Sequence, residues 1–268
     1  MNSLIFFLIE SFVISSLTYI YLHKKTRISL KFLYIDNLIV VLFTFISFLI
    51  IKNLISQNFH FLLFVICPIL VLGFAFSLTM IRFWRTPNRK IIAKDNELIS
   101  PADGNVLYIK KIEKGEVPIS IKNGLKANLV EITQTDILQT PCWLIGINMT
   151  PFDVHKNCAP IEGKIILNKH ISGKFLSLKE PKAIIENERN TLVIRNEKMT
   201  IGVVQTASKL VRRIDSYVNV GDVIKKGHWF GMIRFGSQVD LIIPVSCKVH
   251  IKLGQQIFAK STIIASNN

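Results

Sequence analysis

Arg234-Phe235-Gly236-Ser237-Gln238-Val239-Asp240 places a Gly-Ser dipeptide inside a segment that otherwise has the pattern of a β-strand. Glycine within a strand weakens it and usually marks a bulge or a close approach of two backbones. A serine directly after the glycine holds a hydroxyl within reach of the preceding carbonyl carbon. This geometry becomes chemistry only where a neighbouring group can take the serine proton. The rest of the chain must supply that group.

Short β-like runs separated by turn residues make up the chain from residue 82 onward. The predicted strands are Asn105–Ile112, Leu129–Thr133, Trp143–Met149, Ile161–Asn168, Thr191–Arg195, Met199–Gln205, Gly231–Phe235, Val239–Ile243 and Cys247–Ile251. The stretch Val218–Gly227, with Gly-Asp and Lys-Gly turns, resembles part of a lipoyl-type hammerhead. Many short strands without a long amphipathic helix predict a mainly β domain with a barrel-like or sandwich-like core.

Apolar stretches crowd the first third of the chain. They are Leu4–Leu22, Phe32–Ile51 and Phe61–Ile81, and each has about the 20 residues that a helix needs to cross a bilayer. Glu10 and Asp36 fall in the first two stretches, where charges are costly. Residues 1–81 are therefore expected to form a membrane anchor of two to three transmembrane helices. A cleaved signal peptide is the alternative for the first stretch, and a buried helical core is the alternative for all three.

Basic residues flank these stretches unevenly. Four of them, Lys24, Lys25, Arg27 and Lys31, lie between the first two stretches, and Arg82, Arg85, Arg89 and Lys90 follow the third. Only Lys52 lies between the second and the third. Because positive charge stays on the cytoplasmic side, residues 82–268 are expected to form a cytoplasmic domain at the cell (inner) membrane.

The domain from residue 82 onward is strongly basic. It holds 28 of the 33 Lys and Arg residues but 16 of the 18 Asp and Glu residues, a formal charge of +12. Such a surface attracts nucleic acid or anionic lipid, and no nucleic-acid motif is present. An anionic lipid surface is the expected partner, with ordinary solvated lysine as the alternative. The four cysteines, Cys67, Cys142, Cys158 and Cys247, form no Cys-x-x-Cys pair, which predicts no metal site and fits a reducing compartment.

Two further segments offer an acid and a base for the Gly-Ser dipeptide. Ser100–Gly104 is a turn that presents Asp103 just before a strand, and a plain β-turn is its simpler interpretation. His155 follows a strong strand, together with Asp153, although such a histidine is more often structural or exposed. Asp103, His155 and Ser237 occur in this order, 52 and 82 residues apart.

Together these motifs resemble the phosphatidylserine decarboxylase family, whose members are pyruvoyl-dependent enzymes that convert phosphatidylserine to phosphatidylethanolamine. The resemblance runs through Phe83–Arg89, Ser100–Gly104, Thr150–Pro160 and Tyr217–Pro244. The second and third apolar stretches match the family's membrane hairpin, and Leu4–Leu22 is additional. The Phe-Gly-Ser sequence is similar to that of the short-form branch of the family.

The resemblance implies that the chain cleaves itself between Gly236 and Ser237. The products would be a β chain, 1–236, and an α chain, 237–268, which stay together as a heterodimer. His155, oriented by Asp103, would take the Ser237 proton, and residue 237 would end as a covalent pyruvoyl group. This group would form a Schiff base with the serine headgroup, and His155 would reprotonate the α-carbon after loss of CO2.

One departure from the family concerns the base. Longer members carry a second histidine three residues after the first, where this chain has Cys158. His155 is therefore expected to serve both steps, with Cys158 as the alternative proton acceptor. Arg234 is a candidate ligand of the lipid phosphate, with a plain outward-facing strand arginine as the alternative. Further oligomerisation is left open.

Other functions also stay open at this point. A membrane-anchored binding or adaptor protein with a lipoyl-like module would need no catalysis. Within the enzyme class, the substrate could instead be a related serine-headgroup lipid, such as an archaeal-type ether lipid. A pyruvoyl decarboxylase with a soluble substrate is disfavoured by the predicted membrane spans.

Overall fold

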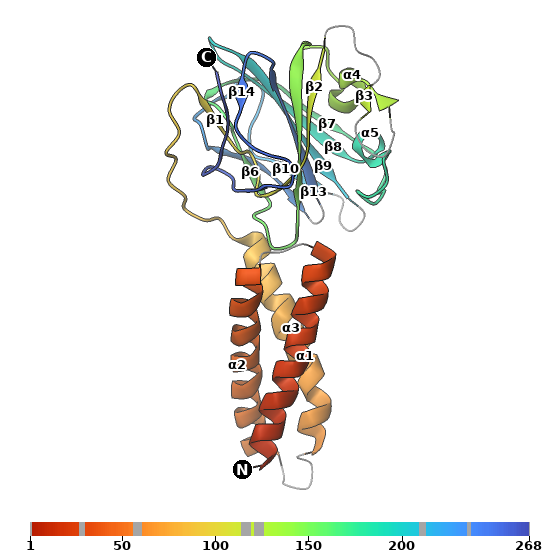
Figure 1. The fold of residues 1–268 in the computed structure, drawn as a ribbon, viewed down its shortest axis with the longest axis vertical. Helices are drawn as coiled ribbons and strands as arrows, with labels where there is room; N and C mark the ends of the chain where they lie inside the picture. Colours follow the sequence, from red (N-terminus) through yellow and green to blue (C-terminus); the bar gives the residue numbers. More distant parts are fainter. Residues whose placement is uncertain are drawn as a thin grey trace. The chain divides into compact units, whose positions relative to one another are not determined.

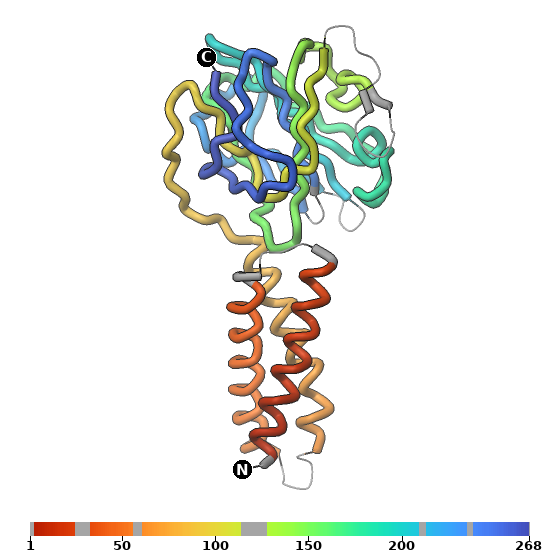
Figure 2. Tube along the Cα trace, viewed as in Figure 1, coloured from red at the N-terminus to blue at the C-terminus, as the bar shows by residue number. Residues whose placement is uncertain are grey.

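The computed structural model describes residues 2–26, 30–55, 61–113, 119–120, 126–208, 213–234 and 237–267. The chain divides into two compact units, residues 1–85 and residues 86–268. Figure 2 follows the backbone trace through each unit.

Three long helices that lie side by side form the first unit (Figure 1). They are α1 (Asn2–Thr26), α2 (Leu30–Leu54) and α3 (Phe61–Trp84). Each contains a segment long and apolar enough to cross a membrane, and large apolar side chains such as Phe6, Ile69 and Phe76 are exposed on them. The structure therefore confirms the three predicted apolar helices, which are compatible with membrane association.

An ion pair between α2 and α3 offsets the cost of burying the Asp36 carboxylate among apolar helices. Asp36 in α2 is buried, and its carboxylate accepts a hydrogen bond from Arg82 Nε of α3 at 2.7 Å. A second contact from the same guanidinium makes the pair bidentate. Because ionisable residues in apolar helices are tolerated when they pair with one another, Asp36 fits within an apolar bundle.

Antiparallel sheets dominate the second unit (Figure 1). The largest has eight strands in the order β11 (Val223–Ile224), β7 (Gly163–Ile171), β8 (Arg189–Arg195), β9 (Thr200–Ala207), β13 (Ser237–Pro244), β5 (Cys142–Met149), β2 (Gly104–Ile112) and β15 (Gln256–Ile257). A three-stranded sheet has the order β10 (Arg213–Ser216), β12 (Trp229–Arg234) and β6 (Lys156–Cys158). A second one has the order β1 (Glu97–Ile99), β16 (Ile263–Ser266) and β14 (Lys248–Val249), and β3 (Ile119–Ser120) pairs with β4 (Lys126–Ala127). The prediction of a mainly β domain preceded by helices is confirmed.

Apolar cores cover both faces of the eight-stranded sheet. On one face, Val239, Leu241 and Ile243 of β13 belong to the larger core. On the other face, Ile242 packs in a second core together with Ile184 of the short helix α5 (Ala183–Glu186) and residues of α4 (Leu129–Thr133). Alternation along β13 thus buries successive side chains in two different cores.

The two strands on either side of the Gly-Ser dipeptide belong to different sheets. β12 ends at Arg234 and belongs to a three-stranded sheet, whereas β13 begins at Ser237 in the eight-stranded sheet. Phe235 and Gly236 lie outside the described residues. The chain therefore passes from one sheet to another at this point.

One predicted strand is wrong. Residues 129–133 form helix α4, because Asn128 and Glu131 build a capping box at its start. The Asn128 side chain accepts from the Glu131 N–H at 2.7 Å, and the Glu131 carboxylate accepts from the Asn128 N–H at 2.8 Å. These reciprocal bonds satisfy backbone donors that only a helix start leaves unpaired. Of the predicted strand 247–251, only β14 forms.

A substitution at Gly146 is expected to destabilise the domain. A Cβ at this position would lie 2.4 Å from the ring of Tyr108, so Gly146→Ala forces the ring to move and costs about 1–3 kcal/mol. The midpoint of thermal unfolding of the detergent-solubilised protein measures this loss. In a Tyr108→Ala background the same substitution should cost much less. An equal cost in both backgrounds would contradict the proposed clash.

Candidate active site

Residue 237 is the first residue of β13, an interior strand of the eight-stranded sheet. Its backbone pairs with Met149 at the end of β5 and with Ala207 at the end of β9. Both partners are apolar and buried. An interior strand with a ladder on each side holds residue 237 at a fixed position.

His155 reaches the same end of the sheet by a short turn after β5. The Asp153 N–H donates to the Thr150 carbonyl at 2.9 Å, and the Asp153 carboxylate accepts from the Thr150 N–H at 2.7 Å. The carbonyl of His155 then accepts from Ile233 N–H at 3.1 Å. His155 thus follows the strand partner of residue 237 along the chain and also bonds to β12, four residues before Ser237.

The hydrogen bonds of the imidazole define its tautomer. His155 is fully buried, and its Nδ1 lies 2.9 Å from the Asp153 carbonyl oxygen. A carbonyl oxygen only accepts hydrogen bonds, so Nδ1 carries the proton. In the neutral ring Nε2 then holds the lone pair, which is the form that can act as a base.

The Asp103 carboxylate binds three residues that lie far apart in the sequence. Its buried carboxylate accepts two hydrogen bonds from Arg89, including one from Nη2 at 2.8 Å, and one from the Ala259 N–H at 2.8 Å. It also accepts from the Val154 N–H at 3.3 Å. Asp103 thus fixes Val154, the residue directly before His155, and its direct orientation of the imidazole stays a prediction.

Arg89 is a residue of this site that sequence reasoning did not assign. Burial lowers the pKa of its guanidinium, but the hydrogen bonds and charge of Asp103 outweigh this effect and leave the pKa raised. Arg89 also donates to the Ala259 carbonyl at 3.0 Å. Its place among the basic residues that follow the third apolar stretch predicts only a membrane-flanking charge, because no local pattern shows a partner 170 residues away.

Cys158 has the properties of a buried hydrogen-bond donor. The residue is fully buried, and its Sγ lies 3.3 Å from the Ser100 carbonyl oxygen. Burial raises the pKa of the thiol to about 12. Near neutral pH the thiol is protonated and donates to Ser100, so its chemistry disfavours a role as proton acceptor.

Arg234 takes part in a small cluster of charges at the end of β12. Its Nε donates to Asp215 at 2.7 Å, and Asp215 also accepts from Arg213 Nε at 2.8 Å. Arg213 and Arg234 are direct strand partners, and both side chains are partly or largely exposed. Two arginines share one carboxylate, which leaves a net positive charge three residues before Ser237.

A cluster of buried polar side chains, Tyr108, Gln238 and Asp240, lies along β13 on the face of the sheet that also carries Ile242. The Tyr108 hydroxyl donates to the Asp240 carboxylate, and Gln238 Nε2 donates to Tyr108 at 3.0 Å and to Asp240 at 3.1 Å. Burial and the Asp240 charge raise the pKa of Tyr108, so its phenol stays protonated as a donor. These residues fix the strand directly after residue 237.

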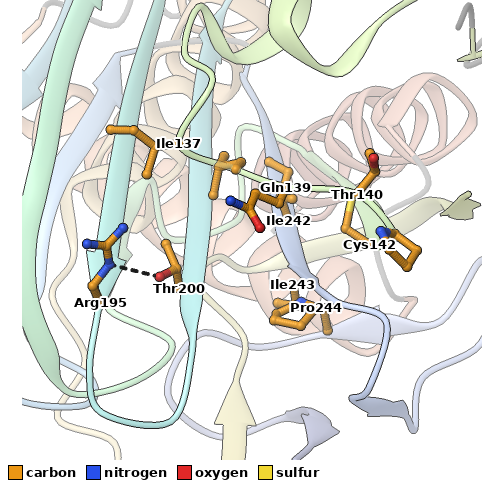
Figure 3. Close-up of a pocket in the computed structure, with 11 residues that line it drawn as sticks. Ile137, Gln139, Thr140, Cys142, Arg195, Thr200, Ile242, Ile243 and Pro244 are labelled. Carbon is orange, nitrogen blue, oxygen red and sulfur yellow. Dashed lines mark hydrogen bonds between the residues drawn. The ribbon is translucent and has the colours of Figure 1, made fainter. Parts of the chain in front are cut away.

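The cavity drawn in Figure 3 is separate from this site. It has a volume of about 400 Å³ and is lined by residues that include Cys142, Arg195, Thr200, Ile242 and Pro244. Pro244 ends β13, and it lies seven residue steps along the extended strand from Ser237, roughly 23 Å. Among the described residues, no group of three His, Cys, Asp or Glu side chains is placed to hold a metal ion.

Comparison with known proteins identifies the family. The model of the phosphatidylserine decarboxylase family matches residues 76–265. The chain belongs to this family. A Methanocaldococcus jannaschii protein, provisionally named archaetidylserine decarboxylase proenzyme, is 39% identical over 193 residues, which is 70% of this chain and 89% of that protein. The phosphatidylserine decarboxylase proenzyme of Cupriavidus pinatubonensis is 35% identical over 191 residues, covering 70% and 78%. Asp103, His155 and Ser237 all lie within the matched range.

The raised pKa of Cys158 predicts that its thiol resists alkylation. With a pKa of about 12, only about one thiol in ten thousand is ionised at pH 8, and only the thiolate reacts. Iodoacetamide at pH 8 should therefore leave residue 158 unmodified in the folded protein and modify it after denaturation, as measured by peptide mass spectrometry. Modification of the folded protein at the rate of a free cysteine would show that the thiolate is accessible and available as a base.

Proposed function

We propose that this decarboxylase acts on phosphatidylserine in the membrane, through a pyruvoyl group that it makes from its own Ser237. Family membership supports a carboxy-lyase and disfavours the adaptor alternative. The observation that carries the site assignment is the position of residue 237. It starts an interior strand beside the His155 turn, directly after the junction between two sheets.

In the proposed self-cleavage, His155 Nε2 removes the Ser237 hydroxyl proton, and the oxygen attacks the Gly236 carbonyl carbon. The amide bond becomes an ester and residue 237 gains a free amine. Loss of the α-proton of residue 237 then breaks its Cβ–O bond, which releases a carboxylate on Gly236 and leaves dehydroalanine at position 237. Addition of water and loss of ammonia convert this residue to a pyruvoyl group.

The surroundings of residue 237 suit such a group. Its two strand partners, Met149 and Ala207, are apolar and buried, so an uncharged keto group there costs less than a charged α-amino group. When present, a pyruvoyl group supplies the electron-withdrawing carbonyl that makes loss of CO2 from an amino acid feasible. His155 is placed to hold and return a proton at the same end of β13.

The substrate assignment rests on the serine headgroup that the names of the relatives share. Two relatives are named for archaetidylserine and two for phosphatidylserine. Archaetidylserine is therefore the second candidate substrate. Arg234 is proposed to bind the lipid phosphate, since Arg213 and Arg234 present more positive charge than Asp215 neutralises.

The membrane anchor fits a substrate that stays in the bilayer. We propose residues 1–81 as the anchor, and the catalytic domain on the cytoplasmic side of the cell (inner) membrane, because basic residues follow the third apolar stretch and such flanks favour the cytoplasmic side. The basic domain surface would hold anionic lipid nearby. The cleaved α and β chains would remain a heterodimer through the ladders that β13 forms with β5 and β9.

The decisive test is the mass of the purified protein and its activity. The wild-type chain should separate under denaturing conditions into a large fragment and one of roughly 3.6 kDa (32 of 268 residues in 30.5 kDa) that is blocked at its N-terminus. Vesicles with phosphatidylserine should release CO2, and vesicles with archaetidylserine test the second substrate. Ser237→Ala should give one intact, inactive chain, whereas the exposed Ser246→Ala should behave as wild type. An intact wild-type chain would overturn the proposal.

His155 is expected to be required for cleavage. His155→Gln removes the imidazole that is proposed to take the Ser237 proton, so the protein should remain a single chain by mass. His228→Gln changes an exposed histidine and serves as the matched control, with normal cleavage. If His155→Gln is cleaved normally but is inactive, another residue accepts the Ser237 proton and His155 serves decarboxylation alone.

A further inference from the structure

One residue near the C-terminus, Ala259, is bound at both its backbone N–H and its backbone carbonyl by a single ion pair. The Ala259 N–H donates to the Asp103 carboxylate at 2.8 Å, and the Ala259 carbonyl accepts from Arg89 Nη1 at 3.0 Å. Asp103 and Ala259 are fully buried. Since Ala259 belongs to residues 237–268, the ion pair joins two segments that self-cleavage would place on separate chains.

Further contacts bind the rest of the turn that contains Ala259. The Lys260 N–H donates to the Ser100 carbonyl at 3.2 Å, and the Ser100 N–H donates to the Thr262 carbonyl at 2.8 Å. The Arg89 guanidinium also lies over the Phe258 ring, 5.6 Å from its centroid. Residues 258–262 are therefore held by Arg89, Ser100 and Asp103, all of which would stay on the large chain.

The sheets hold residues 237–268 unevenly along their length. β13 pairs over its whole length with β5 and over six residues with β9. Beyond β13, the ladders to residues before 237 are short: two residue pairs between β15 and β2, and three between β1 and β16. Short ladders open readily. Buried apolar side chains such as Ile257 and Ile264 also hold the segment after β13 in the main core, and the Arg89–Asp103 pair adds a polar anchor to this packing.

We infer that Arg89 is a positioning residue that docks the C-terminal fragment onto the large chain after self-cleavage. It does so through Asp103, whose carboxylate binds Ala259 of the fragment and also Val154, the residue before His155. The same ion pair therefore sets the position of the fragment relative to the histidine. This inference rests on the proposed cleavage between residues 236 and 237.

The structure predicts different results for removing the Arg89 charge alone and for removing both charges of the pair. Arg89→Gln leaves the buried Asp103 carboxylate without its counter-ion, which is strongly destabilising, whereas replacing both partners of a buried pair is much less so. The double variant Arg89→Gln/Asp103→Asn removes both charges. It should therefore retain the fragment better than Arg89→Gln alone, an outcome that general loss of packing around Arg89 would not give.

The experiment measures retention of the small fragment by the full, cleaved protein. The large chain is immobilised in detergent through an N-terminal tag, washed at increasing urea concentrations, and the bound fragment is quantified by mass spectrometry. Arg89→Gln should lose the fragment at least about tenfold faster than wild type. Lys90→Gln makes the same charge change at an exposed neighbour and should match wild type. Arg89→Lys should be intermediate and serves if Arg89→Gln does not accumulate.

The outcomes separate this inference from the proposed function. A cleaved Arg89→Gln protein that retains its fragment as well as wild type overturns the inference and leaves the proposed function standing. A double variant that loses the fragment faster than Arg89→Gln overturns the charge-pair explanation. A wild-type chain that is never cleaved overturns the proposed function and this inference together.

Discussion

The pairing of β13 between β5 and β9 is the constraint on which the other features of the domain depend. Its register sets residue 237 opposite Met149 and Ala207, and its alternation divides the apolar side chains between two cores. A shift of one residue would exchange these two sets of side chains. It would also move Gln238 and Asp240 away from Tyr108. The backbone of residue 237 is thus positioned by packing along the whole strand.

Much of the architecture could be predicted from periodicity, because long alternating or apolar runs carry a strong signal. The three helices and the strands β2, β5, β8, β9 and β13 belong to this group. Strands of two or three residues, such as β6, β11 and β15, are too short to show a period. Residues 129–133 are rich in branched apolar side chains and predict a strand, but the capping pair of Asn128 and Glu131 favours a helix.

The candidate site shows the same division between local and long-range information. The types and order of Asp103, His155 and Ser237 suggest the chemistry, and the family match covers all three. The partners of Asp103 were not predictable, since Arg89 and Ala259 are 170 residues apart in sequence. The high pKa of Cys158 likewise comes from tertiary burial, which spacing in the sequence cannot show. Sequence therefore suggested the candidate reacting groups, and the fold showed the contacts around them.

The passage of the chain from one sheet to another has a topological consequence. Arg234 ends its ladder with Arg213 in the sheet of β10 and β12, and residue 237 begins its ladders in the eight-stranded sheet. No described ladder depends on the covalent link between these two residues. Breaking that link would leave the hydrogen bonds of both sheets intact, and the two new chain ends could separate independently. Among the described residues, the ladders of both sheets would therefore be the same in a continuous chain and in one interrupted at this point.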